Sequence, residues 1–427
     1  MSREPGGRAA GQSSARKVGI GTVLFAQAVC LSSLPLVAQS VIDSAGVRII
    51  ESRSPRERWE LSRQPSFQVG LADGDSSFLF DEVGAALRLD DGTVIVANCA
   101  DPVLRWFGSD GSFIRATGRT GPGPGEFGAG ECRRSLQLWR LPGESVGTWD
   151  HSRRRIKVFD RDGKFVRELG LERDAPIQGV PSIVGRFGDG GFAVGIRDPM
   201  APPPVGEIWR DSITYHHFRA DGSYGGRIVR LEGWPWVSWD FQLPEGIIRN
   251  PSGRPFAARA ATASGGEHFY YTSGDRFDIR VYGRDGGLRR IIRRSEQPRP
   301  LTPQIRDAYR RARAAGMQTR HDSLTLARME RLLGSREFPE TIATYTELRV
   351  DRDTLLWARA YPLPGDRNVT WSVFDPAGRW LAEIEIPRSF QVLEVGRGYA
   401  IGLVRDSLGV EQVRSYGVLG QPPRSAR

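Results

Sequence analysis

The sequence predicts an all-β fold, a six-bladed β-propeller with a helical hairpin inserted between blades four and five. Three observations support this prediction: a repeated aromatic and Asp-Gly pattern, a second hairpin before each copy, and one insertion with helical spacing. Each repeat supplies four short strands, and such a sheet buries its faces only against neighbouring sheets, as propeller blades do. With 427 residues, 39% of them hydrophobic, the chain can bury a core of this size.

The repeat is an aromatic residue followed four positions later by Gly. It occurs five times, at Phe107 with Gly111, Phe159 with Gly163, Phe218 with Gly222, Tyr282 with Gly286, and Phe374 with Gly378. A large apolar residue stands two positions after each Gly, and four of the copies place Asp directly before it. Asp-Gly between two β-rich runs predicts a hairpin turn, because Gly accepts a positive φ without steric cost.

A second hairpin precedes each copy. Residues 87–97, for example, alternate between apolar and polar, turn at Asp91 and Gly92, and alternate again. Six units result, at 83–117, 133–169, 181–230, 257–293, 343–386 and from 389 to the C-terminus. The last unit lacks a fourth strand, and we expect Val47–Glu51 to supply it beside 413–418, which would close the ring without an exposed sheet edge.

The long gap between the fourth and fifth units predicts two helices. Thr302 is suited to cap a helix that has Pro303 at its first position and continues through residues 305–315. A second helix is expected from about Ser323, where apolar residues recur at helical spacing. Residues 302–334 are therefore expected to form a helical hairpin at one end of the propeller.

The first 38 residues have the pattern of a secretory signal peptide. Basic residues precede an apolar stretch, Val18–Val29, and small residues follow up to Ala38. The stretch is shorter than the ~20 residues that a membrane span needs. We therefore expect cleavage after Ala38, one propeller domain over 39–427, no transmembrane segment in the mature chain, and a location in the periplasm or outside the cell.

The three cysteines bear on the same compartment. Cys30 is removed with the signal peptide, and lipidation of Cys30 is the less favoured alternative because the residues before it fit a lipoprotein signal poorly. Cys99 follows the second strand of the first unit, and Cys132 precedes the first strand of the second unit. Both positions lie on one face of adjacent blades, so a Cys99–Cys132 disulfide is expected, with two separate thiols as the alternative.

The charge pattern argues against nucleic acid as a partner. The formal net charge is +10, with 60 Lys and Arg against 50 Asp and Glu, and both signs are interspersed along the chain. A mixed solvated surface is the simpler interpretation of such a pattern. We expect a monomer that binds no nucleic acid.

Motifs of the first unit are similar to those of known proteins. Leu104–Phe107 and Gly111–Phe113 are followed by a Gly- and Pro-rich run, Gly118–Phe127, that ends in Glu-Phe. With these motifs the chain resembles the exported bacterial six-bladed β-propellers related to the NHL and TolB-like repeat families, over nearly all of its mature length. The resemblance implies the fold but no single activity, because related propellers include ligand binders, lyases and lactonases.

Strand order predicts which loops share the face at which the innermost strands begin. That face carries Arg119 and Glu126 of the Gly- and Pro-rich run. One interpretation is that these two residues bind a ligand, and the alternative is that they clamp their loop to the sheet. The same face also carries Asp150 and His151, which are candidates for acid–base chemistry or, alternatively, polar turn residues that cap a strand.

Two further candidates lie on this face. Arg197 begins the loop before the third strand of the third unit, and Trp236 is the middle of three Trp residues in Gly233–Trp239. Such Trp rings stack on a sugar ring or an apolar ligand, or they pack the loop down over the central channel. The helical insertion is basic, and two interpretations are open. Its face contacts an anionic membrane surface or an anionic partner, or it is a solvated lid without a partner.

These observations favour an exported scaffold that binds a small molecule, a glycan or a protein through loops on one face. The alternative is a lactonase-like or lyase-like enzyme with a central site that uses one metal ion or Asp150 with His151. No sequence motif identifies catalytic residues, which stay unknown. We expect no metal site and no cofactor, because no motif for either is present.

Overall fold

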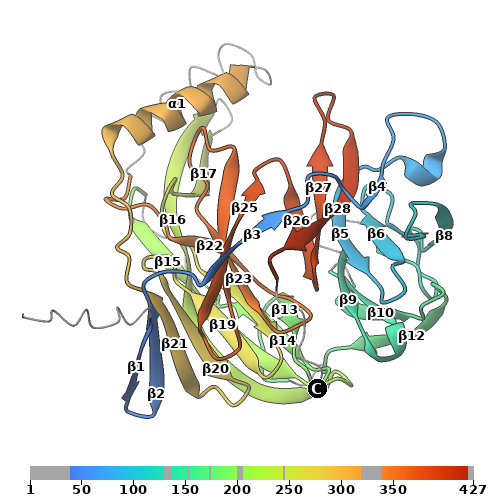
Figure 1. Ribbon diagram of the computed structural model, residues 1–427, viewed down its shortest axis with the longest axis horizontal. Coiled ribbons are helices and arrows are strands. Elements are labelled where there is room, and N and C mark those ends of the chain that lie inside the picture. Colours follow the sequence, from blue (N-terminus) through green and yellow to red (C-terminus); the bar gives the residue numbers. More distant parts are fainter. Residues whose placement is uncertain are drawn as a thin grey trace, which may run out of the picture. The chain divides into compact units, whose positions relative to one another are not determined.

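The structure is a computed structural model that describes residues 39–421 except for 129–135, 152, 173–174, 200–204, 244–245 and 319–337. Residues 38–427 form one compact unit, which is described by itself below. The described part is mostly β, with one α-helix, and its strands form six antiparallel groups that we call blades 1 to 6 (Figure 1).

Blades 1 to 3 contain the first half of the chain, with strands paired in chain order. Blade 1 consists of β5 (Val83–Arg88), β6 (Val94–Asn98), β7 (Val103–Phe107) and β8 (Phe113–Thr117). Blade 2 consists of β9 (Leu136–Arg140), β10 (Val146–Asp150), β11 (Arg155–Phe159) and β12 (Phe165–Gly170). Blade 3 consists of β13 (Pro181–Arg186), β14 (Phe192–Arg197), β15 (Ile208–Phe218), β16 (Tyr224–Leu243) and β17 (Gly246–Gly253).

Blades 4 to 6 contain the second half. Blade 4 consists of β18 (Ala261–Gly265), β19 (His268–Thr272), β20 (Asp278–Gly283) and β21 (Leu288–Arg294). Blade 5 consists of β22 (Tyr345–Val350), β23 (Leu356–Ala360), β24 (Asn368–Phe374) and β25 (Trp380–Pro387). Blade 6 begins with β26 (Gln391–Gly396), β27 (Tyr399–Arg405) and β28 (Glu411–Leu419). Two short 3-10 turns are η1 (Ser76–Phe78) and η3 (Pro142–Glu144).

The innermost strands close into a ring. Strand β5 contacts β9 and β26, and β18 contacts β13 and β22. Arg186 of β13 donates to the carbonyl of Arg140 in β9, and Arg349 Nη1 of β22 donates to the carbonyl of Leu393 in β26 at 2.7 Å. Every innermost strand thus touches both neighbours, which is the arrangement of a β-propeller.

The core lies between the blades rather than at one centre. Six clusters of buried hydrophobic residues each combine side chains from two adjacent blades. Representative pairs in ring order are Trp106 with Phe159, Trp149 with Phe192, Tyr215 with Phe269, Tyr270 with Phe374, Trp371 with Phe390, and Leu403 with Phe107. Each blade therefore depends on its neighbours to bury both of its faces.

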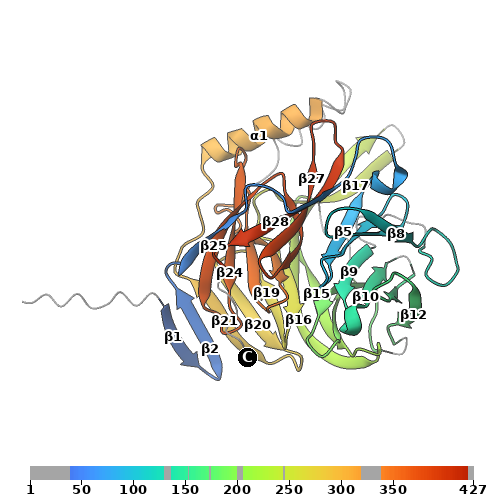
Figure 2. The ribbon, with the colours of Figure 1, turned by 45° about the vertical axis from the view of Figure 1, so that its right-hand side comes forward.

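The N-terminal segment crosses three blades, and it corrects one expectation. Strands β1 (Gln39–Ser44) and β2 (Val47–Ser52) extend blade 4, where β2 pairs in parallel with β21 (Figures 1 and 2). Strand β3 (Glu57–Leu61) pairs with β25 and with the end of β28, and β4 (Phe67–Val69) pairs with β28 as the fourth strand of blade 6.

The expectation that Val47–Glu51 completes the last blade is therefore wrong, because that segment pairs with β21. The N-terminal segment does complete blade 6, but through β4, whose Phe67 and Val69 are buried among side chains of blades 6 and 1. Both segments have the same period-2 pattern, and burial against the open edge of blade 6 decides which one closes it.

The repeated Gly residues form the turns that the sequence predicts. All five have positive φ, between 73° at Gly163 and 89° at Gly378. They also lie against the neighbouring sheet: a Cβ at Gly222 would overlap the Gly170 carbonyl, and a Cβ at Gly286 would overlap the Ile228 carbonyl. The repeated Gly is therefore required both for the turn and for the close approach between neighbouring blades.

The helix α1 (Pro303–Gln318) lies in the chain between blades 4 and 5. Thr302 Oγ1 accepts a 3.4 Å bond from the Ile305 N–H, as expected for a cap. Tyr309 packs edge-on against Phe256 with ring centroids 5.2 Å apart. The second predicted helix, from about Ser323, lies outside the described residues. Within the described ranges no helix is both long and apolar enough to cross a membrane.

Candidate functional site

We call the face at which the innermost strands begin the upper face, and the opposite one the lower face. On the lower face, side chains bridge the ring. Arg352 of blade 5 pairs with Asp90 of blade 1, and Arg140 of blade 2 lies 3.8 Å from Glu394 of blade 6. Glu394 also accepts from Tyr399 Oη at 3.2 Å, and burial raises the pKa of this carboxyl group above its usual value. Each pair skips one blade, so it connects blades that are not adjacent in the ring.

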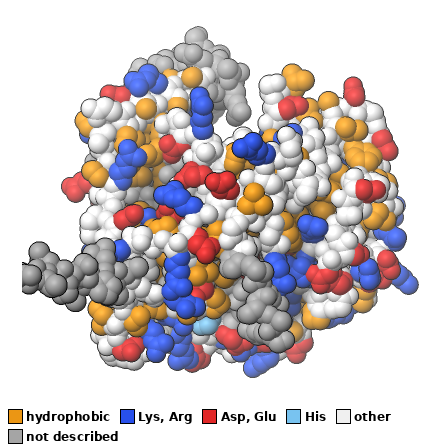
Figure 3. Space-filling view, viewed as in Figure 1, with side chains coloured by type: hydrophobic (Ala, Val, Ile, Leu, Met, Phe, Trp, Pro, Cys, Tyr) orange, Lys and Arg blue, Asp and Glu red, His pale blue; other side chains and the backbone are white. Residues whose placement is uncertain are grey.

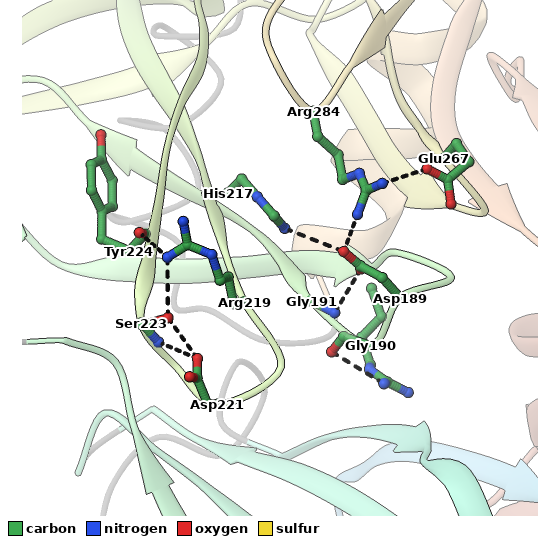
Figure 4. Close-up of polar contacts among 11 residues, drawn as sticks. Asp189, Gly190, Gly191, His217, Arg219, Asp221, Ser223, Tyr224, Glu267 and Arg284 are labelled. Carbon is green, nitrogen blue, oxygen red and sulfur yellow. Dashed lines mark hydrogen bonds and ion pairs between the residues drawn. The ribbon is translucent and has the colours of Figure 1, made fainter.

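A second lower-face network joins blades 3 and 4 (Figure 4). Asp189 pairs with Arg284, whose other nitrogen lies 2.6 Å from Glu267. His217 Nε2 is 3.9 Å from the Asp189 carboxylate, and its ring packs edge-on against Phe187. Burial lowers the pKa of His217 by more than the Asp189 carboxylate raises it. The network ties the turns of two blades together around a neutral His ring.

The upper face contains the candidate site, a cavity of about 490 Å³ between blades 5 and 6 that we call the 5–6 cavity. Its volume falls within the range usual for small-molecule sites. The charged side chains that line it are Arg58, Glu60, Arg63, Glu383, Glu385 and Arg414. Figure 3 shows acidic side chains gathered beside basic ones over β3 and β25.

One wall is the outermost strand of blade 5. Glu383 and Glu385 are two residues apart on β25, so both project from the same side of the strand. Glu383 lies 3.4 Å from Arg294 and 4.0 Å from Arg58, and burial raises its pKa. Glu385 accepts a 2.5 Å bond from the Thr370 hydroxyl. This wall presents two carboxylates to the cavity.

The opposite wall is β28. Arg414 and Tyr416 are again two residues apart and share one side of the strand. Arg414 Nη2 donates to Gln412 at 2.6 Å, and Nη1 lies 3.5 Å from the Tyr416 hydroxyl. The buried Nε of Arg414 has no hydrogen-bond partner among the described residues, and no ion pair to a described carboxylate is formed. The guanidinium is thus held by neutral groups.

Strand β3 and the start of blade 6 complete the cavity. Trp59 is buried against Trp357 with ring centroids 5.9 Å apart, and Phe390 packs edge-on against Tyr416 at 5.3 Å. These rings provide an apolar surface between the two charged walls. The cavity can therefore hold a molecule that has both charged and apolar parts.

Of the predicted site residues, Arg119, Glu126 and Asp150 come together in one loop cluster. Arg119 Nε lies 2.6 Å from Glu126, which also accepts from the Gly123 N–H at 2.7 Å. Asp150 is 1% exposed and accepts from the backbone N–H groups of Gly128, at 3.0 Å, and Arg153, at 3.1 Å. These contacts are the ones expected if Arg119 and Glu126 clamp their loop and Asp150 caps a strand. A binding or catalytic role for these residues stays a prediction.

The other predicted residues lie elsewhere. His151 is half-buried in the turn after β10. Arg197 lies over the Trp236 ring, 5.4 Å from its centroid, and both contact the fully buried Asp211, at 2.7 Å and 3.2 Å. Trp236 also stacks on Trp209 and Trp234. This second cluster has the contacts expected of a packed loop, and ligand binding there stays a prediction.

None of the predicted site residues lines the 5–6 cavity. Sequence reasoning missed Glu383 and Glu385, and it missed Arg414 with Tyr416. The available pattern was a pair of charged or polar residues at i and i+2 on a strand, but solvent-facing strand positions usually carry such residues. In the described part of the chain no group of three or more His, Cys, Asp or Glu is placed to hold a metal ion.

The ring of antiparallel blades defines the class of the protein as a β-propeller. No family model and no curated protein matches the chain. Solved structures similar to it include a Bacteroides fragilis protein named for its expected export (10% identity, TM-score 0.43, covering 86% of this chain and 99% of that one). A Bacteroides vulgatus member of the DUF4221 family has 8% identity and a TM-score of 0.43, with 85% and 99% covered.

A gluconolactonase from Xanthomonas campestris is also similar, with 13% identity, a TM-score of 0.39, and 83% and 99% of the two chains covered. Among such structural matches are six-bladed propellers and exported proteins, as the sequence resemblance implies. At these identities and TM-scores no activity is transferred to this chain. The fold assignment itself rests on the strand pairing.

Proposed function

We propose that the protein is an exported propeller, with a signal peptide at 1–38 and one domain over 39–427, that binds a small molecule in the 5–6 cavity. The observation that carries this proposal is the cavity of about 490 Å³, whose lining combines charged side chains of both signs with aromatic rings. Glu383 supports it, since a half-buried carboxyl group with a perturbed pKa in a cleft is typical of functional sites. The proposal places binding on the upper face, as the sequence predicts for this scaffold.

The test is a thermal-shift screen of the purified mature protein against defined small molecules: free amino acids, dipeptides, neutral and acidic monosaccharides, nucleotides and dicarboxylic acids. A ligand that binds only the folded state raises the unfolding temperature in a concentration-dependent way. We expect at least one class to do so.

The matched variants are Ser389→Trp, which fills the cavity from its lining, and Ser109→Trp, at an exposed turn of blade 1. The Ser389→Trp change should abolish the shift, and the Ser109→Trp change should leave it intact. A shift that survives Ser389→Trp would place binding elsewhere, and the absence of any shift would overturn the proposal.

The contacts of Asp150 do not favour the lactonase-like or lyase-like alternative. Its best candidate, Asp150, already accepts two backbone N–H bonds, one on each carboxylate oxygen. Such bonds hold the carboxylate in a fixed position in its turn, as expected for a residue that caps a strand.

A further inference from the structure

We infer that the ligand of the 5–6 cavity is a small zwitterion, with its carboxylate at Arg414, its ammonium group at Glu383 and Glu385, and an apolar body against the aromatic rings. This inference rests on the proposed function and names the ligand class. A free α-amino acid or a short peptide with an apolar side chain has this chemistry.

The anionic end follows from Arg414. Its guanidinium is half-buried, yet its described partners, Gln412 and Tyr416, are neutral. A charge removed from water is costly unless an opposite charge or full hydrogen bonding compensates it. Because no described carboxylate pairs with it, the planar guanidinium retains donor capacity on its Nη groups that suits a carboxylate.

The cationic end follows from β25. Glu385 is bound by a neutral hydroxyl, that of Thr370, and so keeps its negative charge available. Glu383 lies 3.4 Å from Arg294 and 4.0 Å from Arg58. It projects from the same side of β25 as Glu385, so the two carboxylates together form the acidic wall. An ammonium group, with three donors, can bond to both carboxylates at once.

The middle of the cavity selects the body of the ligand. Trp59, Phe390 and Tyr416 line the cavity, together with the apolar side chains of Leu61 and Val404. The charged residues of the lining comprise three Arg and three Glu, so their formal charges cancel. A neutral lining with separated charges fits a zwitterion better than a polyanion or a cation.

The experiment is calorimetric titration with three matched probes: L-phenylalanine, N-acetyl-L-phenylalanine, which lacks the cation, and L-phenylalaninamide, which lacks the carboxylate. L-leucyl-L-phenylalanine tests the longer zwitterion. We expect at least one zwitterion to bind, and removal of either charge to weaken binding by about tenfold or more. Equal binding of all three phenylalanine probes would overturn the inference.

The variants assign the two ends. Arg414→Gln should weaken zwitterion binding but change amide binding little, and Glu385→Gln should weaken zwitterion binding while sparing the N-acetyl form. Arg414→Lys keeps the charge and should restore part of the affinity, which excludes misfolding as the cause of loss. Arg167→Gln, at an exposed site on blade 2, is the control and should bind as the wild type does.

The inference and the proposed function fail differently. If other molecules of the screen bind in a Ser389→Trp-sensitive way and no zwitterion does, the ligand class is wrong and the cavity function holds. If no molecule binds at all, both fall.

Discussion

At the residue scale, some turns of this propeller pack so closely against the neighbouring sheet that one added Cβ atom would overlap its backbone. The repeated Gly residues combine a positive φ with direct contact to the neighbouring sheet. A glycine in a turn can be required for its positive φ alone. Here the two requirements coincide at Gly222 and Gly286, which lets the turn of one blade lie on the backbone of the blade before it.

Gly286→Ala separates these two effects when it is compared with Gly365→Ala. Both positions have positive φ, 84° and 90°, but only the first would place its Cβ onto another backbone, because nothing lies within 4 Å of Gly365. We expect Gly365→Ala to cost about 1 kcal/mol of unfolding free energy and Gly286→Ala clearly more, up to about 3 kcal/mol. Urea unfolding measures both, and equal losses would contradict the role of interblade contact.

His217 makes stability depend on pH. Burial lowers its pKa in the folded state, so the unfolded chain binds the proton more readily below the ordinary value of about 6.5. The contribution of the neutral ring is present above that pH and is lost as the pH falls. The charges around it are Asp189, Arg284 and Arg219, with Asp189 opposing the shift.

Replacement of this residue tests the assignment. The unfolding free energy of the wild type should fall between pH 7 and pH 5, and His217→Gln should reduce that slope. His216 is buried and His268 is half-buried, and burial lowers the pKa of both, so some slope should remain. If the unfolding free energy of the variant depends on pH as steeply as that of the wild type, His217 does not contribute to the pH dependence.

At the element scale, the N-terminal strands differ in their importance. Strand β4 completes blade 6 and is buried, whereas β1 is an exposed edge next to β2. An edge strand with solvated side chains adds backbone pairing but little hydrophobic burial. The short β4 should therefore contribute more to stability than the longer β1.

Matched Val→Ala changes test this order. Val69 in β4 is 3% exposed and Val41 in β1 is 55% exposed. We expect Val69→Ala to cost about 2 kcal/mol, from lost burial and a residual cavity, and Val41→Ala to cost less than about 0.5 kcal/mol. Chemical denaturation compares the two, and a larger loss at Val41 would mean that blade 6 closes in another way.

At the scale of the whole molecule, stability depends on links between neighbouring blades. Cys99, buried between blades 1 and 2, is disulfide-bonded, and both other cysteines lie outside the described residues. We propose Cys132 as its partner, because both cysteines are expected at the upper face of adjacent blades. Such a bond would connect blade 1 to the connection that enters blade 2.

Peptide mapping without reduction tests this pairing, and a Cys99–Cys132 cross-linked peptide is expected. The closed loop of about 30 residues corresponds to about 3–4 kcal/mol on the chain-entropy model, so Cys132→Ala should lower the unfolding midpoint markedly. A cross-link between Cys99 and Cys30 would show that the signal peptide is retained. Its detection would contradict both the pairing and the predicted cleavage.

The candidate site shows the limit of sequence reasoning most clearly. The sequence places Arg119 beside Glu126 and puts Arg197 and Trp236 on one face, and the structure brings each pair together. Their contacts are mainly with their own loops. The cavity instead combines β25 and β28 with β3, which precedes them by more than 300 residues along the chain, so no local spacing predicts it.

By itself the sequence determined the repeat, the number of blades, their approximate bounds and the first helix of the insertion. These features depend on turn chemistry and on strand and helix periodicity, which act over a few residues. Only the tertiary structure decided that β4 rather than β2 completes the ring, and that Glu383, Glu385 and Arg414 line one cavity. Both outcomes depend on burial between strands that are distant in sequence, and alternation within a strand does not specify its neighbour.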